Sequence, residues 1–213
     1  MVYAVYLRKA ELVNRTPKTY ARIAGILYLV THVTSVLAVA AYGSALLLGG
    51  VTLEFALAIG CVGTGVLLWR LLRDLAPVRA ATFAILRGVE ASVIIAGALP
   101  MLALAWVGGS DGVLVEDATH LHAAAFLLGQ GLVISVNTIV LGWALWDSRV
   151  VPRILAGLGC AGGAIVLLSN LAQLWAVIPL NGAIAGLGAI PIFAFELWLA
   201  ILLIVKGVRH PVD

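Results

Sequence analysis

Six long apolar segments divide this sequence, and they constrain its fold more than any other feature. Each is close to the roughly 20 residues that an α-helix needs to cross the hydrocarbon core of a bilayer. Charged residues make up only 11% of the chain, against about 25% in soluble domains. The sequence therefore predicts an all-α fold, a polytopic membrane protein with a bundle of six transmembrane helices. The expected spans are Arg22–Tyr42, Val51–Trp69, Ala81–Val107, His120–Trp146, Ile154–Ile178 and Ala185–Val205.

Basic residues are confined to alternate connections between these spans. Every Lys and Arg except Arg87 lies before the first span, between the second and third, between the fourth and fifth, or after the sixth. Because basic residues are retained on the cytoplasmic side, we expect both termini to be cytoplasmic. We expect a cytoplasmic segment at 1–20, a transmembrane domain at 21–207 and a short cytoplasmic tail at 208–213. This placement at span ends, rather than along one face, excludes nucleic acid as an expected partner. The expected partner is the lipid bilayer.

Four charged side chains lie inside the predicted spans: Glu54, Arg87, Glu90 and Glu196. A charged group at the centre of a membrane helix costs at least about 2.5–3.5 kcal/mol, so it normally faces a partner or a water-filled cavity. Arg87 and Glu90 are three residues apart, which places them on one helix face where they can pair. One interpretation is a purely structural ion pair buried between helices.

The depths of the polar residues favour a shared site. At 1.5 Å per residue, Glu90, Asn137 and Glu196 each lie about 13 Å from the cytoplasmic edge of their spans, and His32 about 15 Å. We expect Arg87 to keep Glu90 ionised. Glu196 has no basic residue within pairing distance in its own helix, so we expect it to remain protonated unless Arg87 reaches it, and to act as a proton donor. The expected catalytic residues are thus Glu196, Glu90 and Arg87.

A second polar set is predicted nearer the other membrane edge. Glu54 and His122 begin their spans at the same depth, and we include both among candidate ligand-binding residues. Trp198, nearer the interior of its span, is a further candidate for lining a pocket. Two isolated cysteines and mismatched histidine depths supply no usual metal or haem ligand set, so no metal or cofactor is expected. The candidate ligand-binding residues are His32, Glu54, His122, Asn137 and Trp198.

Several segments in their order resemble a known family. From about Thr16 to Arg209, the chain is similar to the bacterial six-helix membrane family described as domain of unknown function 4386. The resemblance implies a fold and a bacterial cytoplasmic membrane, and it implies no activity. Gln130 stands where the family pattern leads us to expect proline, so the bend of the fourth span is expected to differ. The segments are TYARIAGILYLVTHVTS, LRGVEAS, AAFLLGQGLVISVNTIVLGWALWDSRVVPR and PIFAFELWLAILLIVKGVR, and the pattern positions are Glu54, Arg87, Glu90, Asn137, Pro152, Glu196 and Lys206.

Three functions remain open from the sequence. The favoured one is a site that binds a lipophilic small molecule, with a buried Glu as general acid on an isoprenoid-type substrate, by analogy alone. A proton-coupled transporter is the second, since Glu90 and Glu196 occupy the third span of two halves with opposite orientation, as in an inverted repeat. A non-catalytic membrane partner or sensor is the third. No nucleotide-binding loop, zinc-protease motif or nucleophile elbow is present in the sequence.

Overall fold

The computed structural model describes the backbone of residues 2–108 and 112–208, and the side chains of residues 17–108 and 112–208. The described chain is helical throughout and contains no strand, as the sequence predicts. Six helical stretches are long and apolar enough to span a membrane, which confirms the expected number. The elements are α1 (Val2–Gly43), α2 (Leu47–Leu72), α3 (Pro77–Val107), α4 (Gly112–Phe126), η1 (Leu127–Val133), α5 (Ile134–Ser148), α6 (Arg153–Leu174) and α7 (Ala183–Val205).

The helix ends differ from the predicted span ends. The prediction used hydropathy alone, whereas helices begin and end at residues with particular backbone preferences, such as proline and glycine. Helix α3 begins at Pro77 rather than Ala81, since proline is well suited to the first turn, where its missing N–H would have no partner. Helix α3 ends before Gly108, which has a left-handed φ of 68°. The fifth span ends at Leu174 rather than Ile178, because the chain turns back through Ala176, whose φ is 54°.

The second and fourth spans also begin earlier than predicted, at Leu47 instead of Val51 and at Gly112 instead of His120. The fourth span is also not a continuous α-helix, because the seven residues of η1 form a π-helix between α4 and α5. A π-helix inserts extra backbone into each turn and re-aims the side chains that follow. The irregularity coincides with Gln130, where the sequence led us to expect an altered bend.

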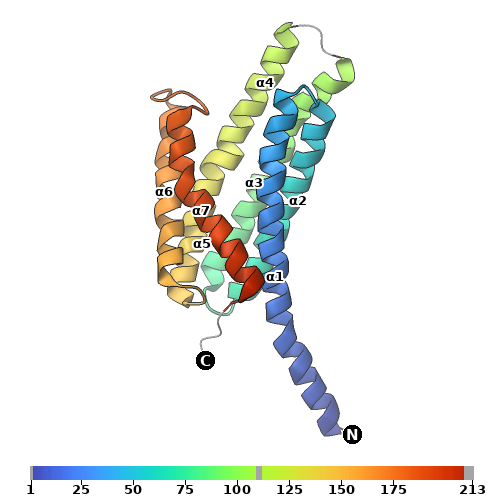
Figure 1. Cartoon of the computed structure of the whole chain (residues 1–213), viewed down its shortest axis with the longest axis vertical. Helices are drawn as coiled ribbons and strands as arrows, with labels where there is room; N and C mark the ends of the chain where they lie inside the picture. The colour runs from blue at the N-terminus through green and yellow to red at the C-terminus, as the bar shows by residue number, and fades with distance from the viewer. Residues whose placement is uncertain (1, 109–111, 209–213) are drawn as a thin grey trace.

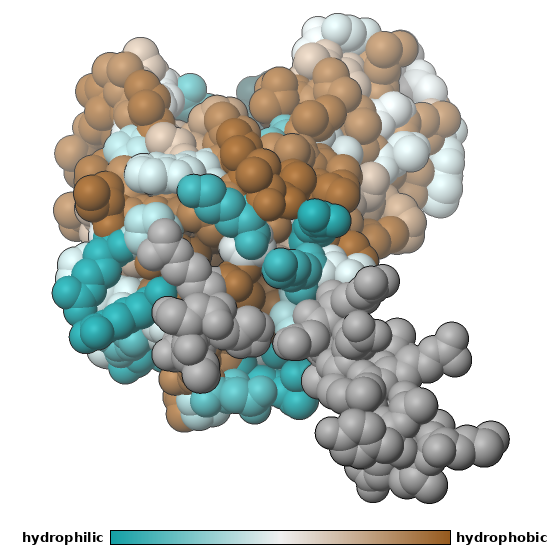
Figure 2. All heavy atoms as spheres, turned by 60° about the horizontal axis from the view of Figure 1, so that its bottom comes forward, coloured by the Kyte–Doolittle hydropathy of each residue, from teal (hydrophilic) through white to brown (hydrophobic). Residues whose placement is uncertain are grey.

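The six spans form a ring in chain order. Each span packs against the next, and α7 returns to pack against α1, which closes the ring (Figure 1). Helix α1 begins, and helix α7 ends, at the same end of the bundle. We call this the basic end, because the described basic residues except Arg87 gather there, as the hydrophilic patch in Figure 2 shows. They are Lys18, Arg22, Arg70, Arg73, Arg79, Arg149, Arg153 and Lys206.

The basic half of the bundle is closely packed. The largest buried core cluster joins α1, α2, α3, α5, α6 and α7 there, and it includes Tyr28, Phe83 and Leu199. Helices α1 and α7 cross with almost no space between their backbones. A Cβ atom added at Gly25 would lie only 2.6 Å from the carbonyl oxygen of Ala200. The absence of a side chain at Gly25 therefore allows the crossing that closes this end.

The opposite half is divided into two groups of helices. A small core cluster of Met101, Leu104 and Ala118 joins α3 to α4, with Tyr42 and Leu47 packed against it. Helices α6 and α7 stand apart from this group, and Figure 2 shows two separate masses of mainly hydrophobic side chains at the far end. Large apolar side chains cover the outer surface of the ring, as expected where lipid rather than water is the surrounding solvent. The chain is therefore a multi-pass membrane protein.

Candidate functional site

Arg87 and Glu90 form a buried ion pair on α3. Each is 2% exposed, and Nη1 of Arg87 donates to both carboxylate oxygens of Glu90, at 3.1 and 2.9 Å. The spacing of three residues places both side chains on the same face of the helix, as the sequence predicts. Gly65 on α2 allows this face to be covered closely, since a Cβ there would lie 2.9 Å from the Cβ of Arg87.

Neighbouring helices complete the hydrogen bonding of this pair. The Nε and Nη2 atoms of Arg87 donate to the hydroxyl oxygen of Thr64 on α2, at 3.1 and 3.0 Å. The amide Nδ2 of Asn137 on α5 donates to Glu90 over 2.6 Å, and the Sγ of Cys61 lies 3.6 Å from the same carboxylate. Three helices thus hold one satisfied polar network, which is the condition for tolerating buried charges.

Glu196 is paired with His32 rather than with Arg87. The Nε2 atom of His32 on α1 lies 3.3 Å from Oε2 of Glu196 on α7. Glu196 has no basic partner in its own helix, as the sequence indicates, but His32 reaches it from α1. The similar depths of His32 and Glu196 in the sequence were the signal that could have identified this pair.

The other nitrogen of His32 restricts how the pair carries its protons. Nδ1 lies 2.8 Å from the carbonyl oxygen of Tyr28. A carbonyl only accepts hydrogen bonds, so Nδ1 must carry a proton. An attractive contact between Nε2 and the carboxyl of Glu196 then requires one further proton, held either by the imidazole or by the carboxyl group. His32 and Glu196 therefore form a proton-sharing pair.

Both pairs face one cavity of about 220 Å³ inside the ring. Glu90 and Arg87 reach it from α3, His32 from α1 and Glu196 from α7, so these four midplane polar residues share one cavity. Asn137 does not line the cavity itself, but it donates a hydrogen bond to Glu90, which does. The rest of the wall is mainly apolar. The lining residues are Thr31, His32, Ser35, Val36, Leu57, Cys61, Arg87, Glu90, Phe126, Gln130, Ile134, Ala189, Ile192, Phe193 and Glu196.

A second polar cluster lies toward the opposite end. The carboxylate of Glu54 on α2 lies 2.8 Å from Nε2 of His122 on α4, and it accepts a hydrogen bond of 2.7 Å from the hydroxyl of Tyr42 on α1. The imidazole of His122 and the ring of Tyr42 also meet edge to face. Glu54 and His122 are therefore in contact, as their matching depths suggest. Within the described residues, no three His, Cys, Asp or Glu side chains come together as a metal site.

The comparison with known families is consistent with this architecture. The family model for the domain of unknown function 4386 matches residues 42–207. The chain belongs to this family. No curated protein and no solved structure matches the chain. The match includes Glu54, Arg87, Glu90 and Glu196 and begins at Tyr42, so most of α1, with His32, lies outside the matched residues of the DUF4386 chain.

Trp198 does not take the place predicted for it in this DUF4386 protein. Its side chain is 42% exposed on the outer surface of α7, and it is absent from the wall of the central cavity. Successive residues of an α-helix are about 100° apart, so Trp198 is about 200° from Glu196 around the axis. Since Glu196 faces the cavity, Trp198 faces the outside of the bundle and does not line this cavity.

Sequence reasoning did not assign two cavity residues to the site. Gln130 on η1 and Ser35 on α1 both line the central cavity, and the hydroxyl of Ser35 donates to Oε1 of Gln130 over 2.9 Å. Gln130 was noted only as a departure from the family pattern. The segment Gly129-Gln130-Gly131, with a polar residue between two glycines in the middle of a span, was the available signal.

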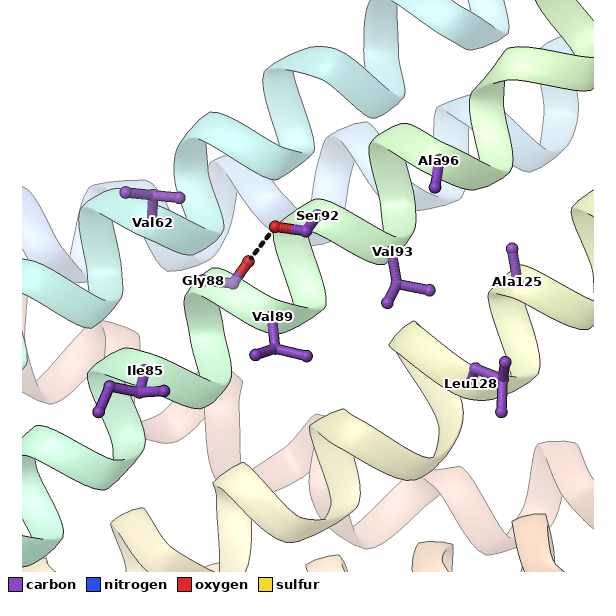
Figure 3. A pocket seen from close by; sticks show the side chains of 9 residues that line it. All are labelled: Val62, Ile85, Gly88, Val89, Ser92, Val93, Ala96, Ala125 and Leu128. Carbon is purple, nitrogen blue, oxygen red and sulfur yellow. Dashed lines mark hydrogen bonds between the residues drawn. The ribbon is translucent and has the colours of Figure 1, made fainter.

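A larger groove lies on the outside of the bundle and has a different character. Its walls come from α2, α3, α4 and η1, and its nine lining residues are apolar except for Ser92 (Figure 3). The hydroxyl of Ser92 is bonded to the carbonyl oxygen of Gly88 at 2.9 Å, so it is satisfied within its own helix. This surface groove therefore suits lipid chains, whereas the central cavity holds the titratable groups.

Proposed function

We propose that the protein binds a neutral lipophilic small molecule in the central cavity and that Glu196, together with His32, donates a proton to it. The observation that carries the proposal is the charge balance of the cavity wall. Arg87 and Glu90 neutralise each other at 2.9 Å, and the His32–Glu196 pair with its shared proton has no net charge. A charged ligand would enter a low-dielectric site without a counter-charge, which is strongly unfavourable.

The wall and the volume of the cavity support a small apolar ligand. Leu57, Ile134 and Phe193 are among its lining residues. The volume of about 220 Å³ is below the roughly 300–1,000 Å³ of pockets that enclose drug-sized molecules. The cavity therefore suits a compact molecule or the reacting end of a longer one whose chain extends toward the lipid. An isoprenoid-type substrate satisfies both requirements.

The two ion pairs would have different roles in an acid-catalysed reaction. Arg87 donates four hydrogen bonds to the side chains of Glu90 and Thr64, so we assign Arg87 and Glu90 to positioning the cavity walls. Glu196 and His32 are 9% and 14% exposed in their side chains, and their shared proton is the mobile one. A group that can release a proton inside an apolar site is suited to general acid catalysis.

A proton-coupled carrier is the second candidate function, and the one-sided closure of the bundle favours it. Alternating-access carriers hold their site near the membrane midplane and close one side at a time. In this protein the crossing of α1 and α7 at Gly25 closes the basic side, while the helix groups are separated at the opposite end (Figure 2). This state corresponds to a carrier open away from the basic end.

We further propose that the basic end faces the cytoplasm of a bacterial cell. The support is the retention of basic residues on the cytoplasmic side of membranes and their concentration at the end where α1 begins and α7 ends. In this orientation the helix groups separate toward the outer leaflet. A lipophilic ligand would then enter from the outer half of the membrane.

Co-purification of a bound molecule tests the binding proposal. The protein is purified in mild detergent and analysed by native mass spectrometry, with the released small molecules identified separately. Ala189 lines the cavity, whereas Ala194 is exposed on the same helix. We expect Ala189→Trp to lose the bound molecule and the control Ala194→Trp to retain it. Identical bound species in both variants would contradict the proposed site.

A further inference from the structure

The cluster of Tyr42, Glu54 and His122 has no part in the ligand site described above, and its position gives it a role. We propose that this cluster supplies protons to the His32–Glu196 pair along a path that passes Gln130. The inference deepens the proposed function, because it assigns the source of the proton that Glu196 donates. It also makes Gln130 a positioning residue for proton transfer.

The cluster of Tyr42, Glu54 and His122, called the outer cluster below, is suited to taking protons from water. Its carboxylate lies between a phenol hydroxyl and an imidazole, at 2.7 and 2.8 Å, so a proton arriving at any of the three groups can be shared. Tyr42 lies next to the end of α1, and the side chain of His122 is 16% exposed. The cluster is therefore near the membrane edge at the opposite end of the bundle.

Gln130 separates this cluster from the central cavity. A small cavity of about 10 Å³ is lined by Glu54, His122 and Gln130 among others, and Gln130 also lines the central cavity. A space of about 10–15 Å³ accommodates a single water molecule when polar partners surround it. One water in the small cavity would join the outer cluster to Gln130.

The contact with Ser35 fixes the orientation of the Gln130 amide. Because the hydroxyl of Ser35 donates to Oε1, the Nε2 group is the end left to donate to water in the path. An amide does not readily give up or take a proton, so Gln130 would orient water rather than carry the proton itself. Ser35 lies three residues after His32 on α1, and both residues line the central cavity. The path therefore continues from Gln130 and Ser35 to the His32–Glu196 pair.

The proton balance is simple. A proton from water at the opposite end enters the outer cluster, passes through the water beside Gln130 and replaces the one that the His32–Glu196 pair gives to the ligand. Arg87, Glu90 and Cys61 are the other titratable groups facing this pair in the cavity. Arg87 and Glu90 are held in their own pair, and Cys61 contacts Glu90. Toward the basic end, the helices are joined by the buried core that includes Tyr28 and Phe195.

Exchange of the His32 ring protons with solvent tests the path without any ligand. The full-length protein is labelled with 15N-histidine in nanodiscs, and the His32 signals are assigned with a His32→Asn variant. The Nδ1 proton, bonded to Tyr28, identifies the ring in both states of the pair, and the exchange that is followed is that of the proton shared between Nε2 and Glu196. We expect Gln130→Met, which removes the amide and keeps the length of the side chain, to slow exchange about tenfold, the factor given by about 1.4 kcal/mol of added barrier.

Matched variants separate the path from general effects on folding. Glu54→Gln and Ser35→Ala should also slow the exchange at His32, while Ser92→Ala on the outer surface and Gln173→Met in the other helix group should not. Ser35→Ala only releases the amide, so it decides the question if Gln130→Met fails to fold. Unchanged exchange in folded Gln130→Met or Ser35→Ala would overturn the proposal. Failure of the ligand test alone would leave these rates unaffected.

Discussion

His32 and Glu196 meet across the interior of the ring, with 3.3 Å between Nε2 of the imidazole and Oε2 of the carboxyl group. The two residues come from the first and last spans, which pack together only because the six helices close into a ring. Tyr28 fixes a proton on the other imidazole nitrogen. The contact therefore links the first and last spans through one shared proton. It lies at the cavity where the proposed ligand binds.

Infrared difference spectroscopy should locate that proton. We expect a protonated-carboxyl band near neutral pH that disappears in Glu196→Gln and persists in Glu54→Gln. The band should strengthen in His32→Asn, because the carboxyl then has no imidazole with which to share the proton. Loss of the band in Glu54→Gln instead would move the proton donor to the outer cluster.

Removing one member of the buried pair on α3 should be more harmful than removing both charges. Arg87→Ala leaves the carboxylate of Glu90 buried without its cation, which destabilises by roughly 3–5 kcal/mol. The double variant Arg87→Ala/Glu90→Gln avoids the unpaired charge and should recover part of this loss. Thermal unfolding in detergent measures the difference. A double variant no more stable than the single one would show that the charge of Glu90 is not the source of the loss.

The exposed pair of Arg79 and Asp147 provides the control for that experiment. Both side chains are more than 30% exposed, at 32% and 43%. Exposed ion pairs contribute about 0–1 kcal/mol, so Arg79→Ala should change the unfolding temperature much less than Arg87→Ala. Equal losses in the two variants would indicate that deleting any arginine destabilises this protein.

The crossing of α1 and α7 should not tolerate even one added carbon. In Gly25→Ala the new Cβ would meet the backbone oxygen of Ala200 at 2.6 Å, which a side-chain rotation cannot relieve. Overpacking of this kind typically destabilises by about 1–3 kcal/mol. Gly88→Ala is the matched control, since nothing lies within 4 Å of a Cβ there, and it should stabilise α3 slightly. Similar unfolding temperatures for both variants would contradict a tight crossing.

The orientation of the bundle can be read from reporter fusions. A reporter placed after Gly108 follows α3 at the end opposite the basic residues, and one placed at Arg149 follows α5 at the basic end. We expect the two fusions to report opposite sides of the membrane, with Arg149 in the cytoplasm. The same compartment for both would overturn the six-span topology, and reversed compartments would overturn the proposed orientation.

The sequence predicted what depends on hydropathy and on axial position. Six spans, the pairing of Arg87 with Glu90 and the shared depth of Glu54 and His122 all follow from composition, helical spacing and position along the membrane. The rotation of a helix about its own axis does not follow from depth. Because this angle is missing, the sequence offered Trp198 as a candidate for lining a pocket and did not identify the contact of His32 with Glu196. The π-helix that positions Gln130 depends on local backbone geometry, which apolar periodicity does not encode.

The close crossing of α1 and α7 at Gly25 has an electrical consequence. Because that end is packed shut, the membrane potential falls partly across the protein between His32 and the basic side. A proton that binds the His32–Glu196 pair from the opposite end would then pass through about half of the transmembrane field. Moving one charge through the whole field is worth about 2.3 kcal/mol per 100 mV, so half of it is worth about 1.2 kcal/mol. Protonation at the pair would therefore respond to membrane voltage as well as to the pH on the side of the membrane opposite the basic end.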